Sequence, residues 1–311
     1  MIRWLVVGIG DITRKRVIPA IQEEPRSQLY GVVSRDAAKG APFAAHVWTN
    51  LDEALKDPAI DAVYVATPVF IHAPQTIAAL RAGKHVLCEK PVALNYPLAC
   101  SMRDAAEQAG RLLGIAYYRR MYAKAIRARE LIRQGVIGRP VLAEINCHSW
   151  FQDEDGTRNW LLDPSQSGGG PLYDIASHRI DLLNFFFGRP LRACGQVSNV
   201  VHQSRVEDCA TVLIEYEGSV RGVVDVRWHS RVDRDEFRVI GTDGEMLLTP
   251  LTQPPLRYPG GVEEHPAHRN LHFPCVANFV DAMEGKAELA APGSSSVWTD
   301  WVTAQVLGRP V

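Results

Sequence analysis

The sequence predicts an α/β domain with a parallel sheet, followed by an α+β domain with a large, mostly antiparallel open sheet. Short apolar strands alternate with helical segments over the first third of the chain, whereas longer alternating strands dominate afterwards. A chain of 311 residues is also more than one hydrophobic core usually organises. We therefore expect a first domain over residues 1–118 and a second over residues 119–311.

The first domain is predicted from apolar runs typical of strands buried on both faces. These runs are Arg3–Val7, Leu29–Val33, Ala62–Ala66, His85–Cys88 and Leu112–Ile115. Helical patterns separate them, at Thr13–Glu23, Asp36–Ala45, Leu51–Lys56, Ile71–Ala82 and Tyr96–Ala109. Strand–helix alternation of this kind implies right-handed crossovers and therefore a parallel sheet.

The second domain opens with a charged helix at Ala123–Gln134 and holds one later strong helix at Tyr173–Phe187. Its other segments alternate apolar and polar residues, as strands with one covered face do. They are Val141–Trp150, Leu191–Val200, Cys209–Tyr216, Val220–Trp228, Phe237–Ile240 and Glu245–Leu248. Residues 251–270 are rich in proline and poor in strand patterns, so we expect an extended surface excursion there.

Composition and charge exclude several functions. The formal net charge is −1, and acids and bases are interspersed, which argues against a nucleic-acid partner. No apolar run approaches the roughly 20 residues that span a bilayer, so we expect no membrane partner. The six cysteines and the histidines are scattered without metal-ligand spacing. We therefore expect no metal, reduced thiols and a cytoplasmic location.

A tight turn follows the first strand and opens a helix. It reads Gly8-Ile9-Gly10-Asp11-Ile12. In a dinucleotide site the first glycine makes the turn, the second lets the backbone approach the pyrophosphate, and the helix N-terminus supplies amide donors. Thr13 replaces the third glycine of the fingerprint, so the match is partial. Its place after the first strand still predicts a Rossmann domain.

The end of the second strand indicates the cofactor. An acidic residue there would bind the ribose 2′-hydroxyl of NAD, but this chain has Ser34-Arg35, with Lys39 one helical turn further on. A hydroxyl and a guanidinium can bind a 2′-phosphate that a carboxylate would repel. NADP(H) is therefore favoured, while Asp36 leaves NAD(H) open.

Further motifs carry a family resemblance. They are Ala66-Thr67-Pro68, His72, the run from Ala82 to Glu89-Lys90-Pro91, Tyr118-Arg119-Arg120, Gly135 to Pro140, and Ser167 to Asp181. Over residues 2 to about 250 the chain resembles the Gfo/Idh/MocA oxidoreductases. The resemblance implies hydride transfer between a nicotinamide cofactor and a hydroxyl or carbonyl group of a sugar, polyol or related cyclic alcohol. It also implies a homodimer or homotetramer paired through the large sheet.

The same resemblance implies roles along the cofactor. Thr67, Pro68 and His72 would lie beside it, and Glu89 and Lys90 would end the fifth strand next to the nicotinamide. A cis peptide before Pro91 is also typical of the family.

Proton transfer needs further groups. Lys90, at a strand end, can donate to the reacting oxygen. Asp174 and His178 are four residues apart on a predicted helix, so they share a face, and a histidine titrates near neutrality. We expect His178 to act as general acid/base, with Asp174 positioning the hydroxyl and Lys90 polarising it. Whether Lys90 or His178 is the formal base stays open.

Aromatic and polar residues are candidates for the substrate wall. Tyr118, Arg119, Tyr122 and Trp160 could pack against sugar C–H surfaces and read hydroxyls, although core packing is an almost equal alternative. Leu161-Leu162 follows Trp160 where related sequences often have a basic residue, and Ala123 stands where they often have proline. The substrate of a relative therefore does not transfer directly.

Two other functions remain open on this scaffold. One is a glycoside-cleaving enzyme that retains NAD and regenerates it in each cycle, which Ser34-Arg35 disfavours. The other is a non-catalytic NAD(P)-sensing regulator, which the joint presence of Lys90, Asp174 and His178 disfavours.

Overall fold

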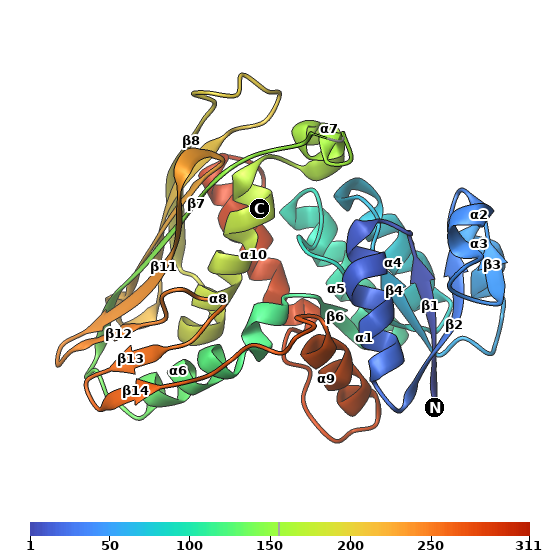
Figure 1. Cartoon of the computed structure of the whole chain (residues 1–311), viewed down its shortest axis with the longest axis horizontal. Coiled ribbons are helices and arrows are strands. Elements are labelled where there is room, and N and C mark those ends of the chain that lie inside the picture. Colours follow the sequence, from blue (N-terminus) through green and yellow to red (C-terminus); the bar gives the residue numbers. More distant parts are fainter. Residues whose placement is uncertain (155) are drawn as a thin grey trace. The chain divides into compact units, whose positions relative to one another are not determined.

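The computed structural model describes residues 1–154 and 156–311 (Figure 1). The chain forms two compact units. The first contains Met1–Ala93, Pro97–Tyr118 and His268–Val297, and the second contains Leu94–Tyr96, Arg119–Ala267 and Trp298–Val311. The sequence predicts that everything after residue 118 forms the second domain, so the return of residues 268–297 to the first unit is a correction.

The first unit is built on a parallel six-stranded sheet in the order β3-β2-β1-β4-β5-β6, as predicted for a Rossmann domain. Its strands are β1 (Ile2–Val7), β2 (Ser27–Val33), β3 (His46–Trp48), β4 (Ala62–Val65), β5 (His85–Cys88) and β6 (Leu113–Ile115). Strand β3 was not predicted, because three residues carry no detectable alternation. Residues 37–40 form only a short helix, α2, where the sequence predicts a longer one.

Helices flank this sheet. They are η1 (Thr13–Val17), α1 (Ile18–Glu23), α2 (Ala37–Gly40), α3 (Leu51–Leu55), η2 (Val69–Ile71), α4 (His72–Arg81), α5 (Tyr96–Ala109) and α9 (Phe273–Met283). The short segment η3 (Tyr118–Met121) spans the passage of the chain from the first unit to the second. Helix α9 packs beside α1, and its Phe279 ring lies 5.4 Å from that of Trp4 on β1. A Cβ at Gly114 of β6 would lie only 3.0 Å from the Phe279 ring. This apolar contact explains why a late segment belongs to the first unit.

The second unit is built on an eight-stranded sheet in the order β14-β13-β12-β11-β7-β10-β9-β8. Its strands are β7 (Pro140–Trp150), β8 (Arg192–Ser198), β9 (Cys209–Glu215), β10 (Arg221–Arg227), β11 (His229–Gly241), β12 (Glu245–Leu247), β13 (Leu256–Tyr258) and β14 (Gly261–Glu263). Among the described strands of this sheet, only β7 and β10 pair in parallel, so the prediction of a mostly antiparallel sheet is confirmed. The hairpin β13–β14 corrects the expectation of a strand-poor excursion over residues 251–270.

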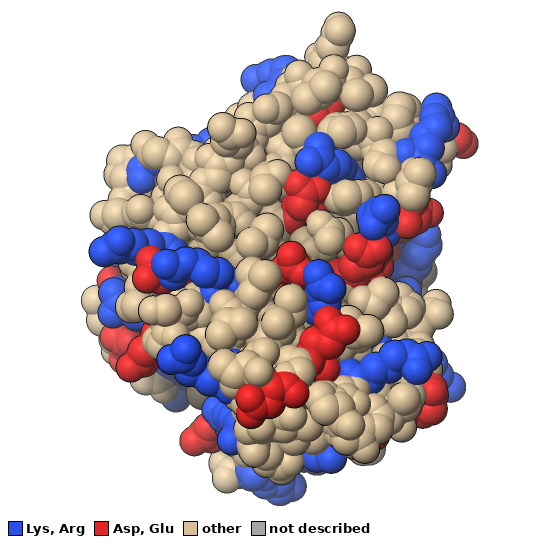
Figure 2. Space-filling view, turned by 90° about the vertical axis from the view of Figure 1, so that its left-hand side faces the viewer, with Lys and Arg blue, Asp and Glu red and all other residues tan. Residues whose placement is uncertain are grey.

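Helices of the second unit cover one face of this sheet. Its helical segments are α6 (Ala123–Arg133), η4 (Asn159–Leu162), α7 (Pro164–Ser167), η5 (Leu172–Ala176), α8 (Ser177–Phe187) and α10 (Gly293–Val306), which begins in the first unit. The exposed turn η6 (Glu217–Ser219) joins β9 to β10 instead. Alternate residues of β7, Ala143, Ile145 and Cys147, are buried. Figure 2 shows the other side, where acidic and basic side chains are interleaved on a largely uncharged surface. Among the described helices, none is both long and apolar enough to cross a membrane.

Candidate active site

The dinucleotide turn has the geometry that its two glycines require. Gly8 adopts φ +94°, and a Cβ there would lie 2.8 Å from the carbonyl oxygen of Ala66. A Cβ at Gly10 would meet no heavy atom of the protein within 4 Å, so this position faces open space. The buried Thr13 hydroxyl donates to the Gly8 carbonyl at 2.8 Å. Thr13 therefore stabilises the turn where the fingerprint has its third glycine.

The residues after the turn begin the first helical segment. Ile9 is half-buried and the Ile12 side chain is exposed. The Asp11 carboxylate is also exposed and accepts a hydrogen bond from Lys15 at 2.7 Å. The side chain of Asp11 is therefore engaged within the helix, and the backbone amides are the groups that suit an anion here.

The end of β2 presents basic groups to solvent. Ser34 is buried, whereas Arg35 and Lys39 are exposed. Among the described residues, no side-chain hydrogen bond or ion pair involves Arg35 or Lys39. Asp36 caps α2, because its carboxylate accepts from the Ala38 amide at 3.0 Å. The acid that kept NAD open is thus engaged in a helix cap.

His72 links the loops after β4 and β5. Its Nδ1 lies 3.0 Å from the Pro91 carbonyl oxygen and its Nε2 lies 2.8 Å from that of Thr67. Burial lowers the pKa of His72, and the two carbonyl contacts oppose that shift. A neutral imidazole has one N–H, so in that form only one carbonyl receives a hydrogen bond. His72 therefore holds backbone, and its contact with a cofactor stays a prediction.

Thr67 and Pro68, the cofactor candidates of the loop after β4, also have local structural roles. The Thr67 hydroxyl donates to Gln75 at 2.7 Å, and Pro68 precedes η2. Because Gly8, Thr67 and Lys90 follow the adjacent strands β1, β4 and β5, all three lie at the carboxyl edge of the sheet. That edge is where open α/β sheets bind ligands.

Glu89 and Lys90 directly follow β5, and the Lys90–Pro91 peptide is cis, as the resemblance implies. The buried Glu89 carboxylate accepts from the Tyr64 hydroxyl at 2.8 Å, from His272 Nε2 at 3.0 Å and from the Lys90 amide at 3.3 Å. Burial would raise the pKa of Glu89, but His272, Tyr64 and Lys90 outweigh it and lower the pKa. Glu89, predicted to bind cofactor, therefore fixes the backbone of Lys90 from inside the protein.

Sequence reasoning missed His272 and Tyr64. His272 lies next to α9, far along the chain from Glu89, and its ring is tilted against that of Tyr118 at a centroid distance of 4.7 Å. Neither residue belongs to a motif of the sequence. Only the unusual position of a histidine just before an apolar helix could have signalled His272.

The second unit carries Asp174 and His178 on one helical segment. Asp174 lies in the π-helical turn η5, and His178, 4% exposed, lies in the first turn of α8. A π turn closes its hydrogen bond five residues on, so residues four apart still share one side of the segment. The predicted α-helix is thus wider at Asp174 than expected. An Arg158 guanidinium lies 3.8 Å from the Asp174 carboxylate, a contact the sequence did not predict.

The glycine run before this helix makes room for protein groups. A Cβ at Gly168 would lie 2.4 Å from the Tyr173 ring, and one at Gly170 would lie 2.0 Å from the Glu207 carbonyl oxygen. The Tyr173 hydroxyl donates to the Leu94 carbonyl at 3.1 Å. Glycine is therefore needed at these positions because the Tyr173 ring and the Glu207 backbone pack directly against them, which the sequence alone did not reveal.

The predicted wall residues differ in their surroundings. The Arg119 guanidinium lies 5.8 Å from the centroid of the Tyr122 ring, which is buried. Trp160 packs against a hydrophobic cluster that includes Phe151, Leu161 and Trp228. For Trp160 the structure therefore supports the core alternative at least in part, since the ring remains half-buried.

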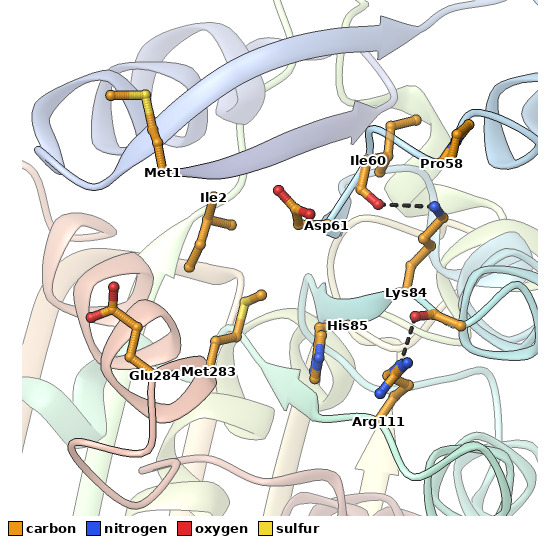
Figure 3. Close-up of a pocket in the computed structure, with 11 residues that line it drawn as sticks. Met1, Ile2, Pro58, Ile60, Asp61, Lys84, His85, Arg111, Met283 and Glu284 are labelled. Atoms are coloured by element: carbon orange, nitrogen blue, oxygen red, sulfur yellow. Dashed lines mark hydrogen bonds between the residues drawn. The ribbon is translucent and has the colours of Figure 1, made fainter.

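A cavity of about 500 Å³ lies at the opposite edge of the first sheet (Figure 3). It is lined by Ile2 and His85, which begin β1 and β5, and by Lys84, whose ammonium donates to the Ile60 carbonyl at 2.9 Å. Because it lies at the amino ends of the strands, it is separate from the edge that holds Gly8 and Lys90.

Comparison with known proteins matches both units. Residues 2–117 match the Gfo/Idh/MocA oxidoreductase family with its NAD-binding Rossmann fold, and residues 125–247 match the Gfo/Idh/MocA C-terminal domain. The chain is 32% identical to a 1,5-anhydro-D-fructose reductase of Ensifer adhaerens, over 96% of this chain and 93% of the relative. It is 26% identical to a D-xylose 1-dehydrogenase [NADP(+)] of Haloarcula marismortui, over 81% and 73%.

A solved structure agrees with these relatives. The aldose-aldose oxidoreductase of Caulobacter crescentus, complexed with glycerol, superimposes with a TM-score of 0.86 at 25% identity, covering 100% of this chain and 99% of that one. The fold and the matched domains define an NAD(P)-binding oxidoreductase. The chain belongs to the Gfo/Idh/MocA family, which confirms the resemblance and the enzyme class expected from the sequence.

Proposed function

We propose that this chain is an NADP(H)-dependent dehydrogenase or reductase that interconverts a hydroxyl and a carbonyl group on a sugar, polyol or related cyclic alcohol. The observation that carries the proposal is the carboxyl edge of the first sheet. There the open Gly10 turn and Lys90, whose backbone amide donates to the buried Glu89 carboxylate, follow neighbouring strands. Family membership supports the reaction class.

The preference for NADP(H) rests on the end of β2. Arg35 and Lys39 are exposed and make no ion pair among the described residues, so both are available to a 2′-phosphate. The Asp36 carboxylate caps α2 through one of its oxygens, which makes it a weaker candidate for a ribose hydroxyl. The haloarchaeal relative is named for NADP⁺, which agrees with this preference.

The residues suit proton transfer. Oxidation of a secondary alcohol releases the hydroxyl proton from oxygen, and hydride acceptance from the same carbon is the chemistry that the nicotinamide supplies when bound. Lys90 Nζ donates to the reacting oxygen and stabilises its negative charge, and His178 takes the proton in oxidation or returns it in reduction. Asp174, with Arg158 beside it, orients His178 or a substrate hydroxyl.

The substrate class follows from the relatives and the aromatic residues. The two named relatives act on an anhydroketose and an aldose, as their names state, and the solved neighbour is an aldose-aldose oxidoreductase. Tyr118, Arg119 and Tyr122 remain our candidates for the wall that contacts the sugar. Trp160 is the weakest candidate, because it packs on the Phe151 cluster.

Steady-state assays test the proposal. We expect turnover of pyranoses or their ketone forms with NADP(H), and weaker turnover with NAD(H). Lys90→Ala and His178→Ala should each lower kcat by about a hundredfold or more, because each removes a proton-transfer group. Arg81→Ala, an exposed change at the end of α4, is the control. Cofactor binding without turnover across both directions would contradict the proposal and favour a sensor.

We also propose that the chain self-associates through the free face of the large sheet and works in the cytoplasm. Leu213 is 43% exposed on β9, where alternation turns it away from the buried residues Val212 and Ile214. All six cysteines are free thiols. Sedimentation of wild type and Leu213→Arg tests the interface, and we expect the variant to dissociate. An unchanged oligomer would place the interface elsewhere.

A further inference from the structure

The backbone of Lys90, the lysine proposed to act on the reacting oxygen, is hydrogen-bonded to a buried polar network that includes His272, a residue far along the chain. Glu89 is 7% exposed and His272 is 3% exposed, and 183 residues separate them in the chain. His272 Nε2 lies 3.0 Å from a Glu89 carboxylate oxygen. An ionised carboxylate only accepts hydrogen bonds, so Nε2 carries the proton and donates.

Glu89 needs this donor. Its Oε1 receives both the Tyr64 hydroxyl and His272, while its Oε2 receives the Lys90 amide. A buried carboxylate that loses a donor is strongly destabilised and recovers by moving toward water or by taking up a proton. Either response changes the acceptor that holds the Lys90 amide.

His272 also contacts the candidate substrate wall. Its ring lies 4.7 Å from the Tyr118 ring, at an interplanar angle of 38°. The His272 amide donates to Asn270 Oδ1 at 3.0 Å, which fixes the ring's own backbone. One buried imidazole therefore touches Tyr118 on one side and the carboxylate that precedes Lys90 on the other.

We propose that His272 is a positioning residue that, through Glu89, sets the position of Lys90 for proton donation and couples it to Tyr118. The inference rests on the proposed function, in which Lys90 acts on the reacting oxygen. His272 does not touch substrate. Its removal should therefore lower kcat while the dissociation constant of the cofactor changes little.

Substitution of His272 separates positioning from folding. His272→Leu fills similar space without a donor, whereas the amide nitrogen of His272→Gln can replace Nε2 toward Glu89. We expect His272→Leu to lower kcat by about tenfold or more, because a hydrogen bond to a buried charge is lost. We expect His272→Gln to keep kcat within about threefold. His46→Leu is the matched control, because His46, in β3, stacks on Tyr30 and, among the described residues, contacts neither Glu89 nor Asn270.

The Glu89→Gln background tests whether the effect passes through Glu89. In that background His272→Leu should add little further loss, since residues that act as a unit are not additive. If His272→Leu fails to fold, His272→Asn replaces it, because the shorter amide does not reach Glu89. Equal kcat in the Asn and Gln variants would overturn the proposal, as would a folded His272→Leu with wild-type kcat. The kcat of Lys90→Ala is measured in parallel. Wild-type kcat in Lys90→Ala would refute the proposed function itself. Loss of kcat in Lys90→Ala together with wild-type kcat in His272→Leu would refute only the role of His272.

Discussion

Replacement of Arg35 by alanine tests the cofactor preference. The guanidinium is exposed just after β2 and has no hydrogen bond or ion pair among the described residues, so its removal breaks no polar interaction within the protein. Hydrogen bonds to a charged group contribute about 1.5–3 kcal/mol, and solvent exposure favours the lower part of that range. A loss of about 2 kcal/mol corresponds to an NADPH dissociation constant roughly 30-fold higher. The dissociation constant of NADH should change by less than about twofold, because it carries no 2′-phosphate.

Fluorescence titration of both reduced cofactors measures this difference. The NADPH effect should shrink at high ionic strength, because an exposed phosphate contact is screened by salt. Arg81→Ala, which removes an exposed charge from α4, should leave both dissociation constants unchanged. Equal weakening of NADPH and NADH in Arg35→Ala would show that the guanidinium contacts the adenosine common to both. No change in either would refute the 2′-phosphate argument.

Three further predictions concern the framework. Gly8→Ala should lower the free energy of unfolding in urea by about 2–3 kcal/mol, because a Cβ at φ +94° would lie 2.8 Å from the Ala66 carbonyl oxygen. Gly10→Ala should keep the stability of the wild type and lose cofactor affinity, and equal stability of the two variants would contradict this reasoning. Asp181→Ala should lower the free energy of unfolding by about 3–5 kcal/mol, because the buried Arg120 guanidinium, whose Nε lies 2.8 Å from Asp181, loses its carboxylate. The double variant R120M/D181L should recover much of this loss, and a small effect of Asp181→Ala on thermal unfolding would show that the pair is dispensable. Hydrogen bonds from Arg127, Tyr258 and His265 lower the pKa of Glu263 to about 2. The stability that the ionised Glu263 contributes is therefore present above its ordinary pKa of about 4.5 and is lost as the pH falls toward 2. The Tm difference between wild type and Glu263→Gln should vanish at low pH, and a constant difference would refute the assignment.

The layout of the first unit could be predicted because its strands are continuous apolar runs and its turns carry glycine. β5 and α5 have the bounds that their patterns indicate. Strands β3, β13 and β14 were missed because each has three residues that are mostly not buried, so no apolar run marks them, whereas the equally short β6 is buried throughout. The placement of α9 was missed for a different reason: it depends on Phe279 meeting Trp4, a contact between distant parts of the chain.

Some residues of the candidate site could be predicted from local sequence, and others depend on contacts between distant parts of the chain. Gly8, Arg35 and Lys90 could be proposed from their place at strand ends, since that chemistry is local. The role of Glu89 could not, because its carboxylate is fixed by His272, 183 residues away. The reason for glycine at residues 168–170 was also not visible in the sequence. The Tyr173 ring occupies the space that side chains at Gly168 and Gly169 would fill, and the Glu207 backbone occupies that at Gly170.

Transfer of deuterium from C4-deuterated NADPH to a ketose or anhydroketose is the most direct test of hydride transfer by this protein. We expect the sugar product to carry deuterium at the reduced carbon, and we expect Lys90→Ala to abolish this transfer while still binding NADPH. NADPH that binds without giving up deuterium to any carbonyl sugar would contradict hydride transfer. So would a sugar that is altered while the bound cofactor is left unchanged.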